Sequence, residues 1–165
     1  MSYYIIVRGP LGCGKSTISD KLSKAFNAEH ISVDRILDDH GLTEDKEDGY
    51  ISQASFKQAN EIIAPKAKQL LKNGKPIIFD GNFYWKSQVD DLIEKLDYPH
   101  YVFTLKIPLE ICIERDQSRN KTHGRDAVEA VYKKSTEFEY GTLIDATGSI
   151  DETIEKILSY IPTSN

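Results

Sequence analysis

The chain has 165 residues, of which 39% are hydrophobic and 28% are charged, and its formal net charge at pH 7 is −5. A chain of this length and composition is expected to fold as one globular domain (residues 1–165) without disulfides or a structural metal. The acidic balance disfavours a surface built for nucleic acid, although a local basic groove would still permit one. The two cysteines, the absence of a leader-like N-terminus and the short apolar runs indicate a cytoplasmic protein with no membrane partner.

Strand-like and helix-like segments alternate along the chain. Strands are expected at Tyr3–Val7, Glu29–Val33, Pro76–Asp80, His100–Ile107 and Thr142–Ala146. Helices are expected at Ser16–Asn27, Gln53–Lys72, Ser87–Leu96, Pro108–Asn120, Asp126–Phe138 and Asp151–Tyr160. The charge-rich stretch Asp38–Asp48 is predicted to be an exposed loop. This alternation predicts an α/β fold in which helices cover both faces of a parallel sheet.

The segment Gly9–Thr17 (GPLGCGKST) carries the clearest functional signal, because it matches the phosphate-binding pattern G-x-x-x-x-G-K-[ST] between an expected strand and an expected helix. The glycines let successive backbone N–H groups point at phosphate oxygens, and the helix directs its positive dipole end at the same place. Lys15 would reach the β- and γ-phosphates, and the hydroxyl of Ser16 would ligate Mg²⁺. The residues predicted to bind the nucleotide here are Gly9, Gly12, Cys13, Gly14, Lys15, Ser16 and Thr17.

Two carboxylates, Asp34 and Asp80, follow two further expected strands. Both are therefore expected at the edge of the sheet where the phosphate-binding segment emerges. Asp34 can take the proton from an acceptor hydroxyl, and the alternative is that it caps the helix that follows. Arg35 beside it can bind an anionic group of the acceptor. Asp80 ends an apolar strand, a place from which an aspartate holds Mg²⁺ together with Ser16.

The residues after Asp80 combine an amide with three aromatic rings. Asn82 is a candidate substrate contact, whereas Phe83, Tyr84 and Trp85 either line an acceptor pocket or pack in the core. No glutamate follows Asp80, although P-loop hydrolases commonly place a water-activating glutamate there. The pattern therefore favours transfer of a phosphate to another molecule over hydrolysis.

Three of the five arginines lie close together, at positions 115, 119 and 125. Arg115 and Arg119 are four residues apart and share one face of an expected helix. Guanidinium groups in such a cluster can clamp phosphates and stabilise charge on a transferred group. The alternative is that they are solvated and pair with Glu114 or Asp116. The histidines show no partner spacing and are expected to be structural.

With these motifs identified, the chain resembles small P-loop kinases of the nucleoside-monophosphate-kinase superfamily, and most of all the AAA-type group with polynucleotide kinase-like and zeta-toxin-like domains. The motifs are IIVRGPLGCGKST, ISVDR, IIFDGNF and ICIERDQSRN…HGRDAVEAVY, in this order. The resemblance implies a three-layer P-loop NTPase fold with a five-stranded parallel sheet in the order 2-3-1-4-5. It implies ATP and Mg²⁺ as cofactors, with Arg115 near the adenine and Asp34 facing the acceptor. Arg119 and Arg125 would act on the phosphates from a short lid, at about residues 115–128.

The first functional hypothesis is an ATP- and Mg²⁺-dependent phosphotransferase that moves the γ-phosphate to a hydroxyl of a small-molecule acceptor, with Asp34 as the base. The expected acceptor-binding region, about residues 35–60, contains a single arginine, which favours an acceptor with little charge. The alternative acceptors are a nucleoside monophosphate or the 5′-hydroxyl of a polynucleotide.

Two other classes of protein are disfavoured. A small GTPase needs the guanine-reading motif N-K-x-D, whereas this chain has Asn120-Lys121-Thr122-His123. A protein that binds ATP without catalysis has usually lost a reactive group, whereas Lys15, Ser16, Asp34 and Asp80 are all present. The sequence therefore predicts a kinase.

Overall fold

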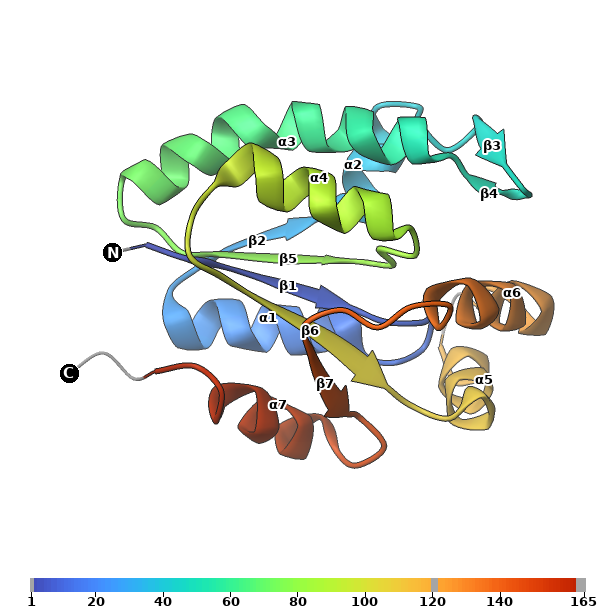
Figure 1. The fold of residues 1–165 in the computed structure, drawn as a ribbon. Coiled ribbons are helices and arrows are strands. Elements are labelled where there is room, and N and C mark those ends of the chain that lie inside the picture. Colours follow the sequence, from blue (N-terminus) through green and yellow to red (C-terminus); the bar gives the residue numbers. More distant parts are fainter. Residues whose placement is uncertain (1, 120–121, 163–165) are drawn as a thin grey trace.

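The computed structural model describes residues 2–119 and 122–162, and its core is a sheet of five parallel strands (Figure 1). The strands are β1 Tyr4–Arg8, β2 Glu29–Ser32, β5 Ile77–Gly81, β6 His100–Lys106 and β7 Thr142–Asp145. Their order is β2-β5-β1-β6-β7, and β3 and β4 form a separate hairpin. Counted in chain order among the five strands of the sheet alone, this order reads 2-3-1-4-5.

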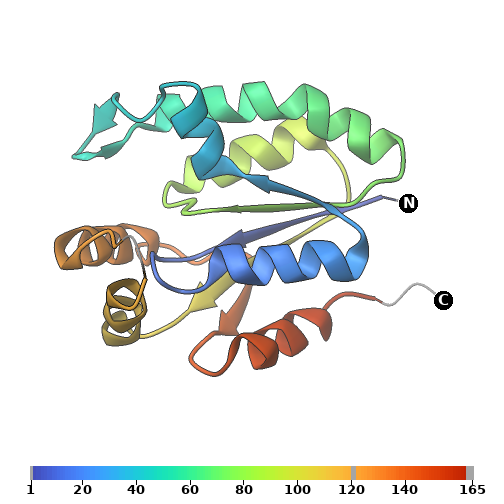
Figure 2. The same ribbon diagram turned by 180° about the vertical axis from the view of Figure 1, so that it is seen from behind.

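Helices cover both faces of the sheet (Figures 1 and 2). The helices α1 Lys15–Phe26 and α7 Ile150–Leu158 lie on one face, and α3 Gln53–Lys72 and α4 Lys86–Leu96 lie on the other. The side chains of β1 alternate between two apolar clusters, with Tyr4 and Ile6 under α3 and α4. Ile5 and Val7 pack with α1 and α7 on the opposite face. A central strand covered on both faces is continuously apolar, which explains the sequence YYIIV.

The remaining helices lie beyond the carboxyl ends of the strands. They are α2 Val33–Asp39, α5 Leu109–Gln117 and α6 Arg125–Ser135. The expected helix over 108–120 is shorter in the structure, where Pro108 is the residue before its first turn. Asn120, where the sequence pattern ended this helix, and Lys121 of the motif N-K-x-H lie outside the described residues. No helix among residues 2–119 and 122–162 is long and apolar enough to cross a membrane.

One helix and one hairpin were missed by the sequence analysis. Val33 begins α2 instead of ending a strand, because the Ser32 hydroxyl caps the helix by accepting from the Arg35 backbone N–H at 3.3 Å. The segment Asp38–Asp48 is not all loop, since it contains β3 (Lys46–Glu47), which pairs antiparallel with β4 (Tyr50–Ile51). Such short strands carry too little periodicity to be recognised in the sequence.

Tertiary contacts hold this hairpin in place. The indole N–H of Trp85 donates to the Ile51 carbonyl at 2.8 Å, and the Ile51 N–H donates to the Tyr84 hydroxyl at 2.9 Å. The Tyr50 hydroxyl donates to the Ala130 carbonyl of α6 at 3.0 Å. The hairpin therefore bridges the end of β5 and the helix α6, which are far apart in the sequence.

Candidate active site

A cavity of about 630 Å³ opens at the carboxyl ends of β1, β2 and β5, and we call it the phosphate-loop cavity. Its lining residues are Leu11, Gly12, Gly14, Lys15, Ser16, Thr17, Ser32, Asp34, Asp80, Asn82, Arg115, Arg119, His123, Gly148, Ser149 and Ile150. Most of the sequence-predicted site residues are among them. The exceptions are Gly9, Cys13, Arg35 and Arg125. The topology brings the others together because parallel strands end at one edge of the sheet.

The phosphate-binding segment, residues 9–17, has the backbone geometry that its glycines predicted. Gly12 and Gly14 have φ angles of 80° and 91°, in the left-handed region that favours glycine. A Cβ on Gly12 would also lie 2.5 Å from the Cys112 carbonyl oxygen, so space excludes a side chain there as well. Lys15 is the first residue of α1, and its Nζ donates to the Pro10 carbonyl at 2.8 Å. The lysine thus lies under the loop at the positive end of the helix.

Gly9 and Cys13 lie outside the phosphate-loop cavity. The Cys13 side chain is fully buried in the core beneath the loop, although its backbone remains part of the loop. Gly9 lines a different cavity on the other side of the loop. A contact of these two residues with the nucleotide would therefore come from their backbone and not from a side chain.

Asp34 lies in the first turn of α2 and lines the cavity. It is not the N-cap of this helix, because Ser32 has that role. Burial raises the pKa of the Asp34 carboxyl, and the nearby charge of Asp80 raises it further. The charge of Lys15 and the backbone N–H of Asn82 act in the opposite direction. A carboxylate that is poorly hydrated holds a proton more strongly than a solvated one, which suits a general base.

Asp80 is buried and lies directly opposite Ser32 in the pairing of β5 with β2. One of its oxygens, Oδ2, is bonded to Nε2 of His30, a histidine that the sequence analysis treated as structural. The hydrogen bond to Asp80 raises the pKa of His30, against the effect of burial. The only sequence signal for this pair is that His30 precedes Ser32 by two residues on β2, which places both side chains on one face.

Asn82 lines the cavity with one unpaired atom. Among the described residues, none bonds to its buried Oδ1. The three aromatic residues that follow it do not line the cavity. Phe83 and Tyr84 are buried in the apolar cluster under α3 and α4, and Trp85 packs against that cluster. Of the two interpretations, core packing is therefore the one that the structure supports.

The three clustered arginines have different surroundings. Arg115 lines the cavity and donates to the carbonyls of Cys13 at 3.4 Å and Gly148 at 3.3 Å, so it ties the phosphate-binding segment to the loop after β7. Arg119 also lines the cavity. Arg125 does not, because its guanidinium is 3.0 Å from a Glu129 oxygen on the exposed side of α6. The expectation that Arg125 acts on the phosphates is not supported by this position.

Arg35, the predicted acceptor contact, is directed away from the site. Its side chain is 82% exposed, and its Nε lies 3.9 Å from an Asp39 oxygen one turn along α2. A surface pair of this kind contributes little free energy. The first turn of α2 therefore presents Asp34 to the cavity and Arg35 to solvent, as neighbouring residues on a helix point in different directions.

His123 and Asp116 form a pair at the cavity that the sequence did not reveal. The Asp116 carboxylate is buried and accepts from the backbone N–H groups of His123 and Gly124, each at 3.0 Å. The His123 ring, which lines the cavity, places Nδ1 3.0 Å from Asp116 Oδ1. These bonds, the His123 backbone N–H first, lower the pKa of Asp116. They appear only when the turn between α5 and α6 folds back on α5.

Arg8 is a fully buried cation at the end of β1, directly before the phosphate-binding segment. It donates to the Phe83 carbonyl at 3.2 Å, to Thr104 Oγ1 at 3.1 Å and to the Ser135 carbonyl at 2.8 Å. Burial lowers its pKa to about 10. Arg8 therefore connects β1 with the residues after β5 and with the end of α6. The sequence gives no signal for it, since a single arginine ending a strand is unremarkable.

Comparisons with known proteins agree on the class of this fold. A family model described as an AAA domain matches residues 5–139. UMP-CMP kinase 2 from Caenorhabditis elegans is 27% identical, over 81% of this chain and 75% of that protein. The adenylate kinase from Bifidobacterium longum is 26% identical, over 95% of this chain and 98% of that protein.

Two solved structures share the fold at low sequence identity. The first is a sugar kinase from Janibacter sp., with a TM-score of 0.79 and 16% identity, over 97% of this chain and 94% of that one. The second is a gluconokinase from Sinorhizobium meliloti, with a TM-score of 0.72 and 14% identity, over 94% of this chain and 89% of that one.

Proposed function

Since the chain belongs to the AAA domain family and is a P-loop kinase, we propose that it transfers the γ-phosphate of ATP, in the presence of Mg²⁺, to a hydroxyl of a small uncharged acceptor. Lys15 and the backbone of the phosphate-binding segment would hold the triphosphate, and Asp34 would accept the proton of the attacking hydroxyl. Arg119 would stabilise charge on the transferred group.

The distribution of charge in the phosphate-loop cavity is the observation that carries this proposal. Its cations, Lys15, Arg115 and Arg119, come from the phosphate-binding segment and from α5. The ends of β2 and β5 contribute Ser32, Asp34, Asp80 and Asn82, none of which is a cation, and no residue of 35–60, all of which are described, lines the cavity. An anionic acceptor at this end would therefore meet two carboxylates and no lining lysine or arginine, and like charges repel.

The state of Asp34 supports its role as the base. Burial raises the pKa of this carboxyl, so its anion is a stronger proton acceptor than that of a solvated aspartate. Asn82 lines the same cavity, and its side-chain amide, whose buried Oδ1 has no partner among the described residues, would bind another hydroxyl of the acceptor. A polyol or a sugar offers several hydroxyls for these two groups.

The residues present also fit a magnesium ion. Mg²⁺ prefers one or two protein oxygen ligands together with phosphate oxygens and water. Ser16 and Asp80 supply a hydroxyl and a carboxylate oxygen at the same cavity, and within the described ranges no group of three or more acidic, histidine or cysteine side chains forms a metal cage. The ion would neutralise phosphate charge when it is bound with ATP.

A nucleoside monophosphate is the second candidate acceptor. It is favoured by the names of the relatives, which include UMP-CMP and adenylate kinases. Against it speaks the absence of a lysine or arginine from the described cavity residues at the ends of β2 and β5. The 5′-hydroxyl of a polynucleotide is disfavoured by the net charge of −5.

The test is transfer of label from γ-labelled ATP, with Mg²⁺, to three separate acceptor pools. The first contains uncharged sugars, polyols and nucleosides, the second contains nucleoside monophosphates and sugar acids, and the third is a 5′-hydroxyl oligonucleotide. We expect labelled product in the first pool. Label restricted to the second or third pool would reject the uncharged acceptor, and unchanged transfer by Asp34→Asn in any pool would reject Asp34 as the base. Asp38→Asn, on the exposed side of α2, is the matched control.

A further inference from the structure

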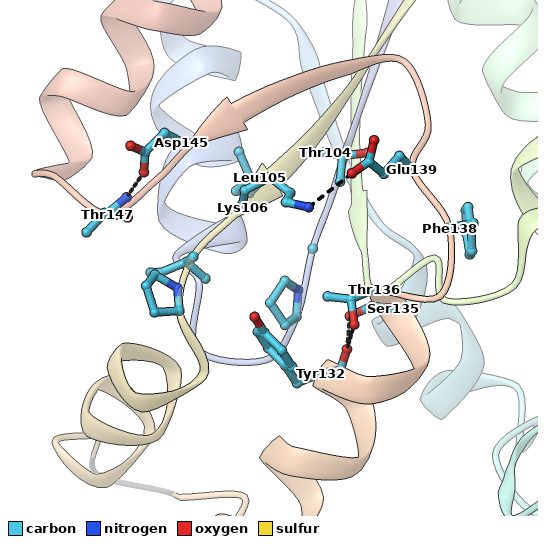
Figure 3. A pocket seen from close by; sticks show the side chains of 14 residues that line it. Thr104, Leu105, Lys106, Tyr132, Ser135, Thr136, Phe138, Glu139, Asp145 and Thr147 are labelled. Atoms are coloured by element: carbon cyan, nitrogen blue, oxygen red, sulfur yellow. Dashed lines mark hydrogen bonds and ion pairs between the residues drawn. The ribbon is translucent and has the colours of Figure 1, made fainter.

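A second cavity, of about 280 Å³, lies behind the phosphate-binding segment, and we call it the rear cavity. Figure 3 shows it between the end of α6, which carries Tyr132, and the tip of β7, which carries Asp145. Its lining residues are all different from those of the phosphate-loop cavity. Neither the phosphates nor the acceptor of the proposed reaction needs it.

Two loops separate the rear cavity from the phosphate-loop cavity. Each loop lines the rear cavity with one of its sides and the phosphate-loop cavity with the other. In the phosphate-binding segment, residues 9–10 line the rear cavity and residues 11–12 line the phosphate-loop cavity. After β7, Thr147 lines the rear cavity and Gly148 lines the phosphate-loop cavity. A molecule in the rear cavity would therefore contact the backs of the two loops that border the nucleotide site.

The rear cavity is lined by rings and aliphatic groups. Tyr132 and Phe138 contribute aromatic rings from the α6 side (Figure 3), and Pro10 and Pro108 contribute their rings from two loops. Flat side chains of this kind pack well against a planar ring. The Phe138 ring is held in place, because the Arg8 guanidinium lies 4.2 Å from its centre.

The charged groups at the rear cavity already have partners. Lys106 and Glu139 form an ion pair at 3.2 Å, which Figure 3 shows above the cavity. Asp145 accepts from the Thr147 backbone N–H at 2.9 Å, and hydrogen bonds from Thr147 together with the charge of Lys156 lower its pKa. An anionic ligand would therefore find no free cation among the lining residues, and a cationic one would have only Asp145, which already accepts a hydrogen bond. An uncharged ligand needs no counter-ion. The phosphate-loop cavity has the opposite character, because Lys15, Arg115 and Arg119 line it and would bind phosphates.

The wall of the rear cavity is bonded to the start of the phosphate-binding segment. Arg8 precedes Gly9, and it donates to Thr104 Oγ1 and to the Ser135 carbonyl, which both belong to lining residues. A shift of α6 or of the chain around Phe138 would therefore act on Arg8 and on the residues that follow it. This connection gives a ligand in the rear cavity a physical route to the nucleotide site.

We propose that the rear cavity is a second ligand site, for a small uncharged compound with a planar ring, and that its occupant changes the affinity for ATP. By linkage, ATP and the ring compound change each other's dissociation constants by the same factor. The inference requires nucleotide binding but no particular acceptor, so its failure leaves the proposed reaction untouched.

Three probes with one ring system and different charges test the ligand chemistry: indole, which is uncharged, tryptamine, a cation, and indole-3-acetate, an anion. Each is titrated into the full chain while the backbone amide resonances are followed by NMR, with and without saturating ATP and Mg²⁺. We expect indole to shift residues 104–108, 135–139 and 145–147 in both states. We expect the dissociation constant of each charged probe to exceed that of indole by about tenfold or more.

Thr136→Trp and Lys133→Trp form a matched pair of variants. Thr136 is exposed at the end of α6 and lines the rear cavity, so a tryptophan there fills the space without removing a core contact. Lys133 is exposed on the same helix and does not line the cavity. We expect Thr136→Trp to weaken indole binding about tenfold or more and Lys133→Trp to leave it unchanged.

The coupling is measured from the ATP dissociation constant with and without indole. We expect a change of about fivefold or more, mirrored in the indole dissociation constant with and without ATP. Absence of indole binding at its solubility limit would overturn the proposal, as would resonance shifts confined to residues 11–17 and 148–150 that ATP abolishes. Equal ATP affinity with and without bound indole would overturn the coupling.

Discussion

The two ends of the phosphate-loop cavity are built in different ways. The nucleotide end is built around the phosphate-binding segment, whose backbone and lysine are set by neighbouring residues in the chain, and α5 with the residues just after it adds Arg115 and Arg119. The acceptor end is assembled from the tips of β2 and β5, beside a hairpin that Tyr84 and Trp85 hold in place. The nucleotide end carries the cations of the cavity, whereas the acceptor end carries two carboxylates, a hydroxyl and an amide. A local segment can be recognised from sequence, whereas a surface assembled from distant segments cannot. The five predictions below test the two ends separately.

The largest effect is expected at the nucleotide end, from Lys15→Ala. The ammonium group lies at the start of α1, where it would stabilise charge on the β- and γ-phosphates. We expect kcat/KM to fall by about 10³-fold or more, since preorganised charge in a water-poor site is a large catalytic contribution. Thermal unfolding should stay close to that of the wild type. Lys24→Ala, at an exposed position of the same helix, is the control, and substantial residual activity of Lys15→Ala would contradict the assignment of the loop.

At the acceptor end, Asp34→Asn is expected to lower kcat by about 10²-fold or more, because an amide cannot take the proton of the hydroxyl. The KM for ATP should change little, because Asp34 belongs to α2 and not to the loop that holds the phosphates. Steady-state kinetics in both substrates separate these parameters. Equal losses in kcat and in ATP affinity would show that Asp34 only supports the structure.

The lid arginines should differ from each other. We expect Arg119→Ala to lower kcat/KM by about 10- to 100-fold, because this side chain lines the cavity and can bond to phosphate oxygens. Arg125→Ala should alter kcat/KM by less than about threefold, because its guanidinium pairs with Glu129 in an exposed position. A larger effect from Arg125 than from Arg119 would mean that the α6 end of the lid swings into the cavity when substrates bind.

The pH profile of kcat/KM should report Asp34. Burial and the charge of Asp80 raise the pKa of this carboxyl, and only its deprotonated form acts as a base. Activity should therefore fall as the pH decreases through that raised pKa, by about tenfold per pH unit, with the acidic limb above the usual range of an aspartate. Asp34→Asn should lack this limb. The same limb in the variant would assign it to another group.

The smallest effect on activity is expected from Asp116→Asn, whose main consequence should be on stability. The carboxylate is bonded to three nitrogens of His123 and Gly124, and the variant should lower the free energy of unfolding by about 1–3 kcal/mol. Because the pKa of the Asp116 carboxyl is lowered in the folded state, the stabilisation that this carboxylate gives is fully present at pH values above the ordinary pKa of an aspartate. It is lost as the pH falls through the lowered pKa.

Chemical denaturation at neutral and acidic pH measures this difference. Asp126→Asn, at an exposed position in the first turn of α6, is the control. Equal stability of Asp116→Asn and the wild type at neutral pH would show that solvent replaces these bonds.

The sequence predicted the five strands of the sheet and most of the helices that cover it, because the apolar residues of these segments recur with the period that their burial requires. It missed α2 and the β3–β4 hairpin, whose short segments depend on the Ser32 cap and on contacts with Tyr84 and Trp85. Of the candidate site residues, Arg35 and Arg125 are surface groups. A position beside Asp34 did not fix the direction of the Arg35 side chain, and closeness in sequence to Arg119 did not place Arg125 at the cavity. His30, His123 and Arg8 were missed, since each is defined by a partner far away in the chain or across a turn.

The sequence by itself determined the phosphate-binding segment, the class of enzyme and the edge of the sheet where the candidate site lies. These features depend on backbone geometry and on periodicity, which neighbouring residues encode. Only the tertiary structure decided which charges line the phosphate-loop cavity, how Asp116 binds the backbone before α6, and that a second cavity lies behind the phosphate-binding segment. Such features arise where elements distant in the chain pack together, and their free energy depends on burial and on partners that no local pattern records.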